Sequence, residues 1–261
     1  MRTTITSIHW RRARPGATAV VVLAASLLLG SCATASRPFA PLPPQETPTA
    51  AWTSLRQTRD RFDGARSFAR LRVQEGERVR SLRGRLLVDP RGRMLLEGIT
   101  PLGTAAFTLY ADGPEATWLD HVHGTHWKGR LGEIARFFGE RAEGGEMGLL
   151  MLALPVDSGA VVVDEGSPLI AVGSEGSRYV ISETGLSSVD IPLEGDRRVV
   201  VAYDPPSFPP RNVRISYEVS SRTHAALEIT HLDLSSASIR IEPPRIPPHY
   251  VPSLPPGVAV Q

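Results

Sequence analysis

The sequence predicts a mainly β protein, either a barrel or a strongly curved antiparallel sheet, on three observations. Apolar and polar residues alternate over many short segments, turn residues separate these segments, and proline-dense stretches lie on either side of the region. In Ala69–Gln74 the apolar side chains all point one way, as in a half-buried strand. Roughly ten or more such segments with regular turns are typical of a barrel or a curved sheet.

The alternation sets the expected strands in chain order. The first half has turns at 75–77, 89–92 and 111–114, each containing glycine. These turns separate strands expected at Ala69–Gln74, Leu82–Leu86, Arg93–Ile99, Thr104–Ala111 and Glu115–Asp120. The second half is expected to hold strands at Ala160–Asp164, Arg178–Glu183, Arg198–Asp204, Asn212–Ser220, Ala226–Leu234 and Ser238–Glu242.

Helices are expected at three places. Thr49–Phe62 carries a partial apolar stripe that includes Trp52 and Leu55. Apolar residues at helical spacing predict an amphipathic helix over 130–142. After the Gly144-Gly145 break, the same spacing recurs at Met147, Leu150, Met151 and Leu154. The two helices after residue 130 need a surface to cover, and the open side of the curved sheet is the obvious one.

The expected domain occupies residues 49–242, between two proline-rich segments. Residues 32–48 are predicted to be an extended tether. Residues 243–261 are again proline-dense, so they can form neither a central strand nor a helix interior. We expect them to form an extended tail that lies on the domain or projects from it.

Residues 1–31 have the features of a secretory signal peptide. Four arginines precede an apolar stretch, Ala17–Leu29, which is too short to span a bilayer, and small residues follow. The sequence Leu28-Leu29-Gly30-Ser31-Cys32 resembles the lipobox of bacterial lipoproteins. That resemblance implies cleavage before Cys32 and a diacylglycerol-modified thiol. The alternatives are a plain signal peptide or an uncleaved anchor.

The composition bounds the function. Four of the 29 Lys and Arg residues precede Cys32, which leaves 25 against 27 Asp and Glu. The mature chain is therefore slightly acidic and gives no reason to expect nucleic-acid binding. Cys32 is the sole cysteine, so no intrachain disulfide is possible.

The sequence gives little support for catalysis. It contains no phosphate-binding glycine loop, zinc-protease helix or serine nucleophile elbow. His121, His123 and His126 form the one dense histidine cluster, beside Asp120, and would make a metal site in one interpretation. We favour the other interpretation, a polar hairpin end with Gly124 in the turn. We expect no enzymatic activity, cofactor or metal.

The segment from Leu95 to Leu109 carries a family resemblance. A leucine-rich strand ends, Pro101-Leu102-Gly103-Thr104 forms a turn, and a strand resumes. Together with the upstream helix carrying Trp52 and the strand pair, this order resembles the outer-membrane lipoprotein receptor LolB and its relatives of the LolA/LolB superfamily, over residues 49–155. The proline-rich tail and the loops around 121–130 and 164–178 depart from that pattern.

The resemblance implies an unclosed antiparallel half-barrel with a helical lid over an apolar cavity. It also implies that Leu102 protrudes from its turn and serves membrane insertion; the alternative is a leucine folded back over the sheet edge. The residues expected to line a cavity for acyl chains are Leu71, Val73, Leu86, Leu96, Phe107, Leu109, Phe138 and Leu150. The alternative for each of these is an ordinary filled core.

The resemblance further implies that the protein receives acylated proteins, or another lipid, from a periplasmic LolA-like carrier. Ala33 and Thr34 follow Cys32 with no Asp, which favours the outer membrane over inner-membrane retention. We expect a lipid-anchored, periplasm-facing monomer. The alternative is a structural or assembly lipoprotein of the envelope that binds a protein partner through a sheet edge or the proline-rich tail.

Overall fold

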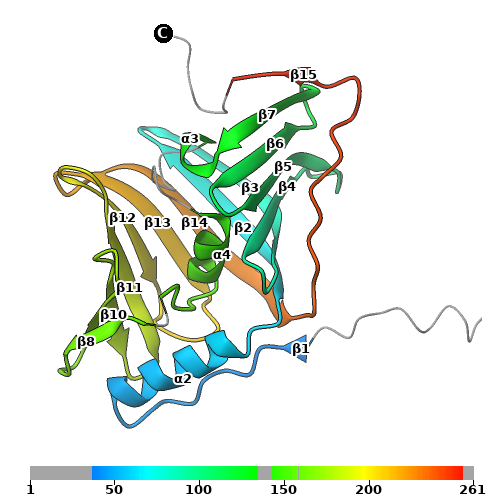
Figure 1. The fold of residues 1–261 in the computed structure, drawn as a ribbon. Coiled ribbons are helices and arrows are strands. Elements are labelled where there is room, and N and C mark those ends of the chain that lie inside the picture. The colour runs from blue at the N-terminus through cyan, green and yellow to red at the C-terminus, as the bar shows by residue number, and fades with distance from the viewer. Residues whose placement is uncertain (1–36, 135–142, 158, 255–261) are drawn as a thin grey trace, which may run out of the picture. The chain divides into compact units, whose positions relative to one another are not determined.

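The computed structural model describes residues 37–134, 143–157 and 159–254 (Figure 1). Within these residues, 15 strands form one sheet, in the order β15-β7-β6-β5-β4-β3-β2-β14-β13-β12-β11-β10-β9-β8, with β1 paired to β14 off this path. Adjacent pairs are antiparallel except β15–β7. The expected mainly β class with an open, curved antiparallel sheet is confirmed.

The sheet consists of two meanders. The first contains β2 (Ala65–Glu75), β3 (Arg78–Val88), β4 (Arg93–Ile99), β5 (Ala105–Asp112), β6 (Glu115–Asp120) and β7 (Thr125–Arg130). The second contains β8 (Val161–Asp164), β9 (Leu169–Val172), β10 (Arg178–Ser182), β11 (Gly185–Pro192), β12 (Arg197–Tyr203), β13 (Asn212–Val219) and β14 (Arg222–Ser236). Pairing of β2 with β14 joins them.

This topology explains where the helices lie. The chain leaves the first meander at β7 and enters the second at β8, and each of these strands lies at or next to an outer edge of the sheet. The connection between them carries α3 (Leu131–Ile134) and α4 (Gly144–Met151). In Figure 1, α4 lies between the two meanders, where it packs against β3, β4 and β5. The expected helix at Met147–Leu154 is therefore present, although its last residues form a turn.

The inner face of the first meander is a continuous apolar surface. Leu86, Leu96 and Leu109 lie directly opposite one another across β3, β4 and β5. Gly84 and Gly98 are also cross-strand partners. Side chains fill the space that these glycines leave: a Cβ atom at Gly98 would clash with Phe107, whose ring lies over that position. Glycines of this kind allow close packing at a bend in a sheet.

Helix α2 (Pro48–Asp60) covers one end of the second meander. Its N-terminus is capped by Thr47, whose Oγ1 accepts a hydrogen bond from the backbone N–H of Ala50 at 3.2 Å, and Pro48 occupies the first turn. Its apolar stripe packs against β10 and β11. The Trp52 ring lies 5.5 Å from that of Tyr179, measured between centroids.

Both proline-rich segments are extended in their described parts, and both lie against the sheet. In the N-terminal segment, β1 (Arg37–Pro38) pairs with β14, and the Leu42 N–H donates to the Phe208 carbonyl oxygen at 3.0 Å. The C-terminal tail runs along the outside of the first meander (Figure 1) and ends in β15 (Val251–Pro252), which pairs with β7. Of the two arrangements expected for the tail, residues 243–254 therefore adopt the one on the domain.

One expected strand is wrong. Residues 238–242 form no strand, because β14 ends at Ser236 and the chain then turns along the outside of the sheet, where the Ile241 N–H donates to the Asp89 carboxylate at 3.3 Å. Five of the strands described, β1, β7, β9, β11 and β15, were not predicted. Of the expected helix over 130–142, Arg130 is the last residue of β7, Leu131–Ile134 form α3, and residues 135–142 lie outside the described residues.

Filling the space over Gly98 should destabilise the sheet. We predict that Gly98→Ala lowers the free energy of unfolding by about 1–3 kcal/mol, because the added methyl overpacks a filled site. Urea unfolding followed by circular dichroism measures this change. The control is the same substitution made in a Phe107→Leu protein, where Gly98→Ala should lower the free energy of unfolding by less. An equal loss of stability in the presence and absence of Phe107 would contradict the packing explanation.

Candidate functional site: the interior of the curved sheet and its plug helix

The expected cavity residues converge on the inner face of the sheet. Leu71, Leu86, Leu96 and Leu109 are each at most 4% exposed and belong to one hydrophobic cluster. Val73 and Phe107 are partly buried and pack against the same cluster; Phe107 also stacks on Trp118 with 4.4 Å between ring centroids. Leu150 reaches the cluster from α4, and Phe138 lies outside the described residues.

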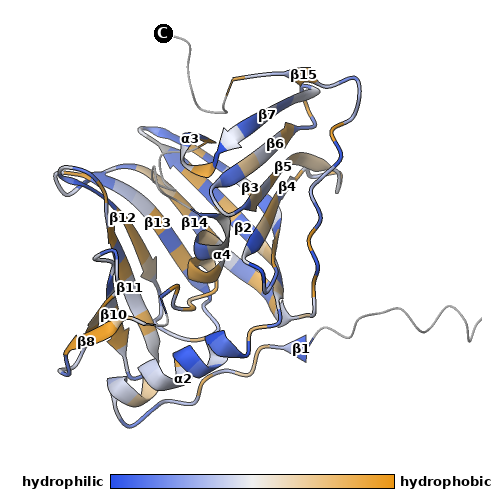
Figure 2. Cartoon of the chain, in the orientation of Figure 1, coloured by the Kyte–Doolittle hydropathy of each residue, from blue (hydrophilic) through white to orange (hydrophobic). Residues whose placement is uncertain are grey.

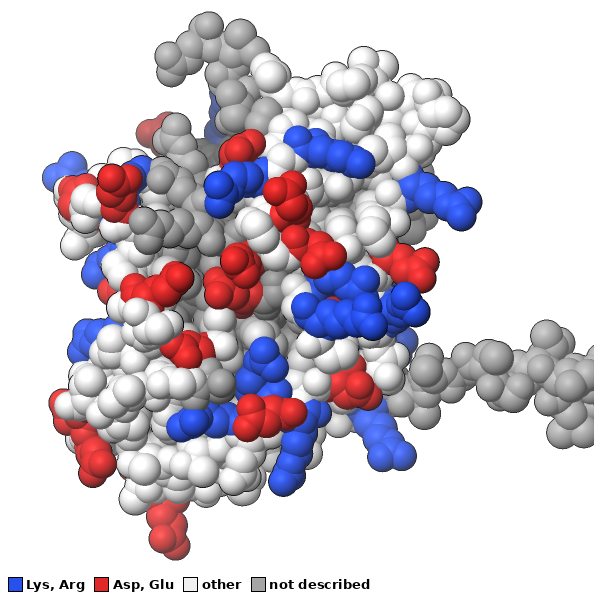
Figure 3. All heavy atoms as spheres, viewed as in Figure 1, with Lys and Arg blue, Asp and Glu red and all other residues white. Residues whose placement is uncertain are grey.

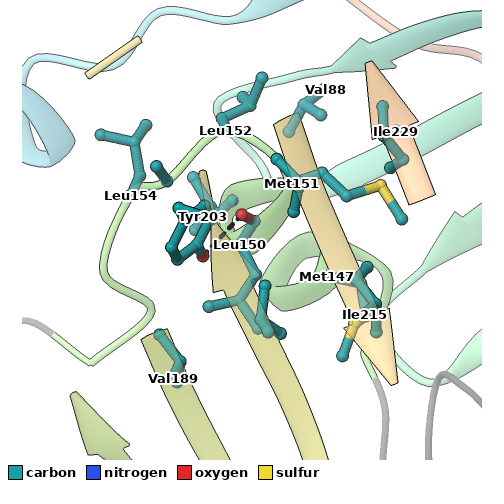
Figure 4. Close-up of a cluster of buried hydrophobic side chains, with 14 of the residues drawn as sticks. Val88, Met147, Leu150, Met151, Leu152, Leu154, Val189, Tyr203, Ile215 and Ile229 are labelled. Atoms are coloured by element: carbon teal, nitrogen blue, oxygen red, sulfur yellow. Dashed lines mark hydrogen bonds between the residues drawn. The ribbon is translucent and has the colours of Figure 1, made fainter. Parts of the chain in front are cut away.

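Helix α4 occupies the interior as a plug. Figure 4 shows its side chains inserted between the two meanders, with β3 on one side and β11–β14 on the other. Each labelled side chain is at most 4% exposed: Val88, Met147, Leu150, Met151, Leu152, Leu154, Val189, Tyr203, Ile215 and Ile229. Gly148 lies against Val88, and a Cβ atom built at Gly148 would be 3.5 Å from the Val88 Cβ. The described residues therefore form a filled core here.

Two buried side chains of the second meander bind the last carbonyl groups of the plug. The Tyr203 hydroxyl on β12 donates to the Leu150 carbonyl oxygen at 2.8 Å. The His231 ring on β14 contacts the Met151 carbonyl oxygen through Nε2 at 2.9 Å. The Leu150 carbonyl oxygen also accepts from the Ala153 N–H at 3.0 Å, whereas His231 is the partner of the Met151 carbonyl, an acceptor that a helix end leaves without an intrahelical bond. The bonds from Tyr203 and His231 fix the C-terminal end of α4 to the sheet.

His231 requires a neutral ring in this position. Its Nδ1 lies 2.6 Å from the Ser67 hydroxyl oxygen on β2, so a proton on Nε2 lets the ring donate to Met151 and accept from Ser67. Burial lowers the pKa of His231 to about 4. The ring therefore connects β2, β14 and α4 without carrying a charge at neutral pH.

At the N-terminal end of α4, a carboxyl group has a raised pKa, whereas the pKa of His231 is lowered. Desolvation raises the pKa of the Glu146 carboxyl to about 7, and the negative charges of Glu143, Glu175 and Asp157 add to the effect. Glu146 itself is an exposed residue in the first turn of α4. Over the face viewed in Figure 3, anionic and cationic side chains are interspersed.

The Pro101-Leu102-Gly103 turn connects β4 to β5 and projects its leucine. The Thr100 N–H donates to the Thr104 carbonyl oxygen at 2.8 Å, and Gly103 has a φ of +83°, which suits glycine. Leu102 is 91% exposed. Of the two orientations considered for this side chain, the structure therefore has the exposed one.

The three clustered histidines point to different partners. His121 contacts Thr108 at 2.9 Å and the Tyr250 hydroxyl of the tail at 2.7 Å. His123 binds the Asp120 carboxylate at 2.7 Å. Within the described residues, no group of three or more His, Cys, Asp or Glu side chains is arranged to hold a metal ion. The arrangement is that of a polar hairpin end to which the tail is bound.

A separate crevice of about 330 Å³ lies between α2 and the N-terminal segment. It combines apolar and polar side chains: Phe39, Leu42, Ser54, Gln57, Thr58, Arg61, Phe62, Asp63 and Ser236. None of the residues that we expected to line a cavity contributes to it. Cys32 and the expected signal peptide lie outside the described residues. Of the helices described, none combines the length and apolarity that crossing a membrane requires.

Comparison with known proteins gives structural neighbours only. No protein-family model matches the chain, and no curated protein matches it. Similar solved structures include a LolA superfamily protein from Nitrosomonas europaea, with 11% identity over 76% of this chain and 95% of that chain, and a TM-score of 0.47. A domain assigned to outer membrane lipoprotein sorting, from Vibrio parahaemolyticus, has 8% identity over 75% and 94%, with a TM-score of 0.48. A DUF1329 family protein from Desulfovibrio piger has 13% identity over 75% and 95%, with a TM-score of 0.44.

The residues that hold the plug were not predicted from the sequence. Tyr203 ends a strand after the continuous apolar run Val199–Ala202, and His231 lies in a long strand with several other polar residues. Their partners are 53 and 80 residues away in the chain. The one available signal was a histidine at an inward-facing position of a predicted strand, where burial demands a hydrogen-bond partner.

The buried neutral His231 predicts acid sensitivity. Because the unfolded chain binds this proton near pH 6.5 and the folded chain only near pH 4, stability is lost as pH falls through that window. We expect the free energy of unfolding to fall by about 3 kcal/mol more in the parent than in His231→Gln between pH 7 and pH 4. Chemical denaturation at several pH values measures the difference.

Comparing the parent with the His231→Gln variant isolates the contribution of His231 to the pH dependence of stability. Glu146 contributes stability that is present below pH 4.5 and lost as pH rises towards 7, the opposite sign, but it is common to both chains. Parallel pH profiles for the parent and His231→Gln would mean that His231 is not held neutral by burial.

Proposed function

We propose that this chain is a non-enzymatic, lipid-anchored protein of the outer membrane that binds acyl chains inside its curved sheet. In the proposed cycle it receives an acylated protein, or another lipid, from a soluble periplasmic carrier and releases it into the membrane. Cys32 carries the anchor and Leu102 enters the bilayer. The observation that carries the proposal is the plug: a short apolar helix fills a sheet interior whose lining is otherwise apolar.

The free energy of burying the side chains of α4 is comparable with that of burying an acyl chain in their place. Fully burying a Leu or Met side chain contributes about 1.5–3 kcal/mol, and each buried CH₂ of an acyl chain about 0.8 kcal/mol. About two to four methylene groups therefore match one side chain of α4. Met147 and Met151 are unbranched and adaptable, which favours repacking around a flexible chain. An acyl chain is thus able to replace α4 at comparable energy.

The proposed lipid anchor at Cys32 and the 100–104 turn have complementary tasks. A single acyl chain holds a membrane weakly, whereas a diacylglycerol-modified cysteine supplies two chains. The fully projecting Leu102 adds an insertion point of about 1.5–3 kcal/mol when its side chain enters hydrocarbon. The domain then stays at the bilayer while the turn opens a local path for the released lipid.

One observation favours a second candidate, the structural or assembly lipoprotein. Strand β8 ends the sheet and exposes Val161 and Val163, at 66% and 62%. Figure 2 shows the same strand as hydrophobic. An apolar edge strand of this kind is suited to pairing with a strand of another protein. The edge next to β7, by contrast, is already paired with the chain's own tail.

Stapling the plug should abolish acyl binding. In a chain spanning 33–261, which has no native cysteine, Val88→Cys with Gly148→Cys places two Cβ atoms about as far apart as a disulfide requires. We predict that the oxidised form binds a fluorescent fatty acid at least tenfold more weakly than the reduced form, because α4 no longer leaves the interior. Titration by fluorescence measures both affinities.

The single variants Val88→Cys and Gly148→Cys are the controls, and neither should respond to oxidant. Equal binding by the oxidised and reduced double variant would show that acyl chains do not replace α4. An absence of binding by the parent, with an intact circular dichroism spectrum, would reject acyl binding altogether and leave the second candidate.

Leu102→Glu should separate uptake from delivery. We expect the variant to bind a fluorescent triacylated cysteinyl peptide as the parent does, but to transfer it to phospholipid vesicles at least tenfold more slowly, because a carboxylate does not enter hydrocarbon. Val122→Glu, at an exposed valine on the neighbouring turn, is the matched control and should transfer normally. Normal transfer by Leu102→Glu would remove the proposed membrane role of the turn.

A further inference from the structure

The outer face of the sheet carries two arginines in direct opposition. Along β2, Ser67, Ala69 and Leu71 point inward, so the intervening residues point outward. Arg70 of β2 pairs with Arg83 of β3 in the register of the sheet, and both are exposed. Like charges directly opposite one another on one face of a sheet are destabilising. The position therefore calls for an anion.

Neighbouring arginines on the same face have carboxylate partners. Arg72 and Arg214 both bind Glu228, at 3.3 and 2.7 Å. Arg85 binds Glu97 at 2.6 Å. The two glutamates next to the Arg70–Arg83 pair are thus already occupied. Among the described residues, neither Arg70 nor Arg83 forms an ion pair.

The rest of the row supplies no carboxylate either. Thr230 of β14 lies opposite Arg70 on its other side, and Ile99 of β4 lies opposite Arg83. Across β14, β2, β3 and β4, the cross-strand neighbours at this position are therefore Thr230, Arg70, Arg83 and Ile99. With no acidic side chain among them, the counter-charge for Arg70 and Arg83 must come from outside the chain.

The pair lies beside the turn that carries Leu102. Ile99 is the last residue of β4, and the 100–104 turn follows it directly, so Leu102 is three residues beyond the partner of Arg83. Phe68, two residues before Arg70 on β2 and on the same outer face, is 44% exposed. Cationic and exposed apolar side chains are thus adjacent on one surface. This combination is complementary to an anionic membrane surface, where phosphate groups overlie hydrocarbon.

We propose that Arg70 and Arg83 bind the phosphate groups of anionic phospholipids when the 100–104 turn enters the bilayer. The pair orients the outer face of β2 and β3 towards the headgroups and sets the depth of Leu102. This inference rests on the proposed membrane role of Leu102, but it requires neither an acyl cavity nor movement of α4.

Vesicle binding by chain 33–261 tests the proposal. This chain lacks the lipidated cysteine and keeps every described element, since the compact unit begins at Ser36. We expect the parent to bind vesicles containing phosphatidylglycerol more tightly than vesicles of phosphatidylcholine alone. Each arginine near an anionic surface is worth about 1 kcal/mol, or roughly fivefold in affinity, so Arg70→Gln with Arg83→Gln should weaken binding about thirtyfold. Co-sedimentation with vesicles measures the affinities of the parent and of the double variant.

A matched double variant controls for net charge. Arg56→Gln with Arg178→Gln removes two exposed arginines from α2 and β10, in the other half of the protein, and should bind phosphatidylglycerol vesicles within about threefold of the parent. Equal binding of both vesicle types by the parent, or an equal loss in the two double variants, would overturn the proposal.

A second measurement separates this inference from the proposed function. The Arg70→Gln, Arg83→Gln chain should bind the fluorescent fatty acid with the affinity of the parent, because the arginines lie on the face opposite the interior. Loss of vesicle binding with intact fatty-acid binding supports the headgroup role. Retained vesicle binding overturns it, whatever the result with fatty acid.

Discussion

The rest of the structure depends on the need to cover the apolar inner face of an unclosed sheet. Because the two meanders join through β2 and β14, the connection from β7 to β8 carries a helix across the concave side. Helix α4 covers that surface, and its last two carbonyl groups accept hydrogen bonds from Tyr203 and His231. Burial of the Met151 carbonyl without the His231 donor would leave an unsatisfied acceptor in the core, at about 1–3 kcal/mol.

The same constraint links stability to function. In the part of the chain that the structure describes, α4 contacts the sheet through side-chain packing and through the hydrogen bonds of Tyr203 and His231, and we propose that it separates from the sheet. The β2–β14 junction, in contrast, is held by a ladder of pairs running from Ala65 to Glu75. Local opening follows such differences in contact, so α4 is the element expected to move first while the sheet persists.

The sequence predicted the architecture better than the site. Strands Arg93–Ile99 and Glu115–Asp120 were predicted with the observed bounds, because each begins directly after a glycine-containing turn, at 89–92 and 111–114. The Ser238–Glu242 strand was wrong because alternation alone does not say whether a neighbouring strand is available. The roles of His231, Tyr203 and the Arg70–Arg83 pair depend on register and on contacts distant in sequence, which periodicity does not encode. The resemblance favoured an exposed Leu102, and its side chain is 91% exposed in the structure.

The central claim is that α4 occupies the place of an acyl chain. Hydrogen exchange of the backbone amides, with and without a saturating fatty acid, tests it most directly. The account predicts that amides of Gly144–Met151 exchange faster in the presence of fatty acid while those of β2 and β14 stay protected. Unchanged or slower exchange in α4 with the fatty acid bound would contradict it.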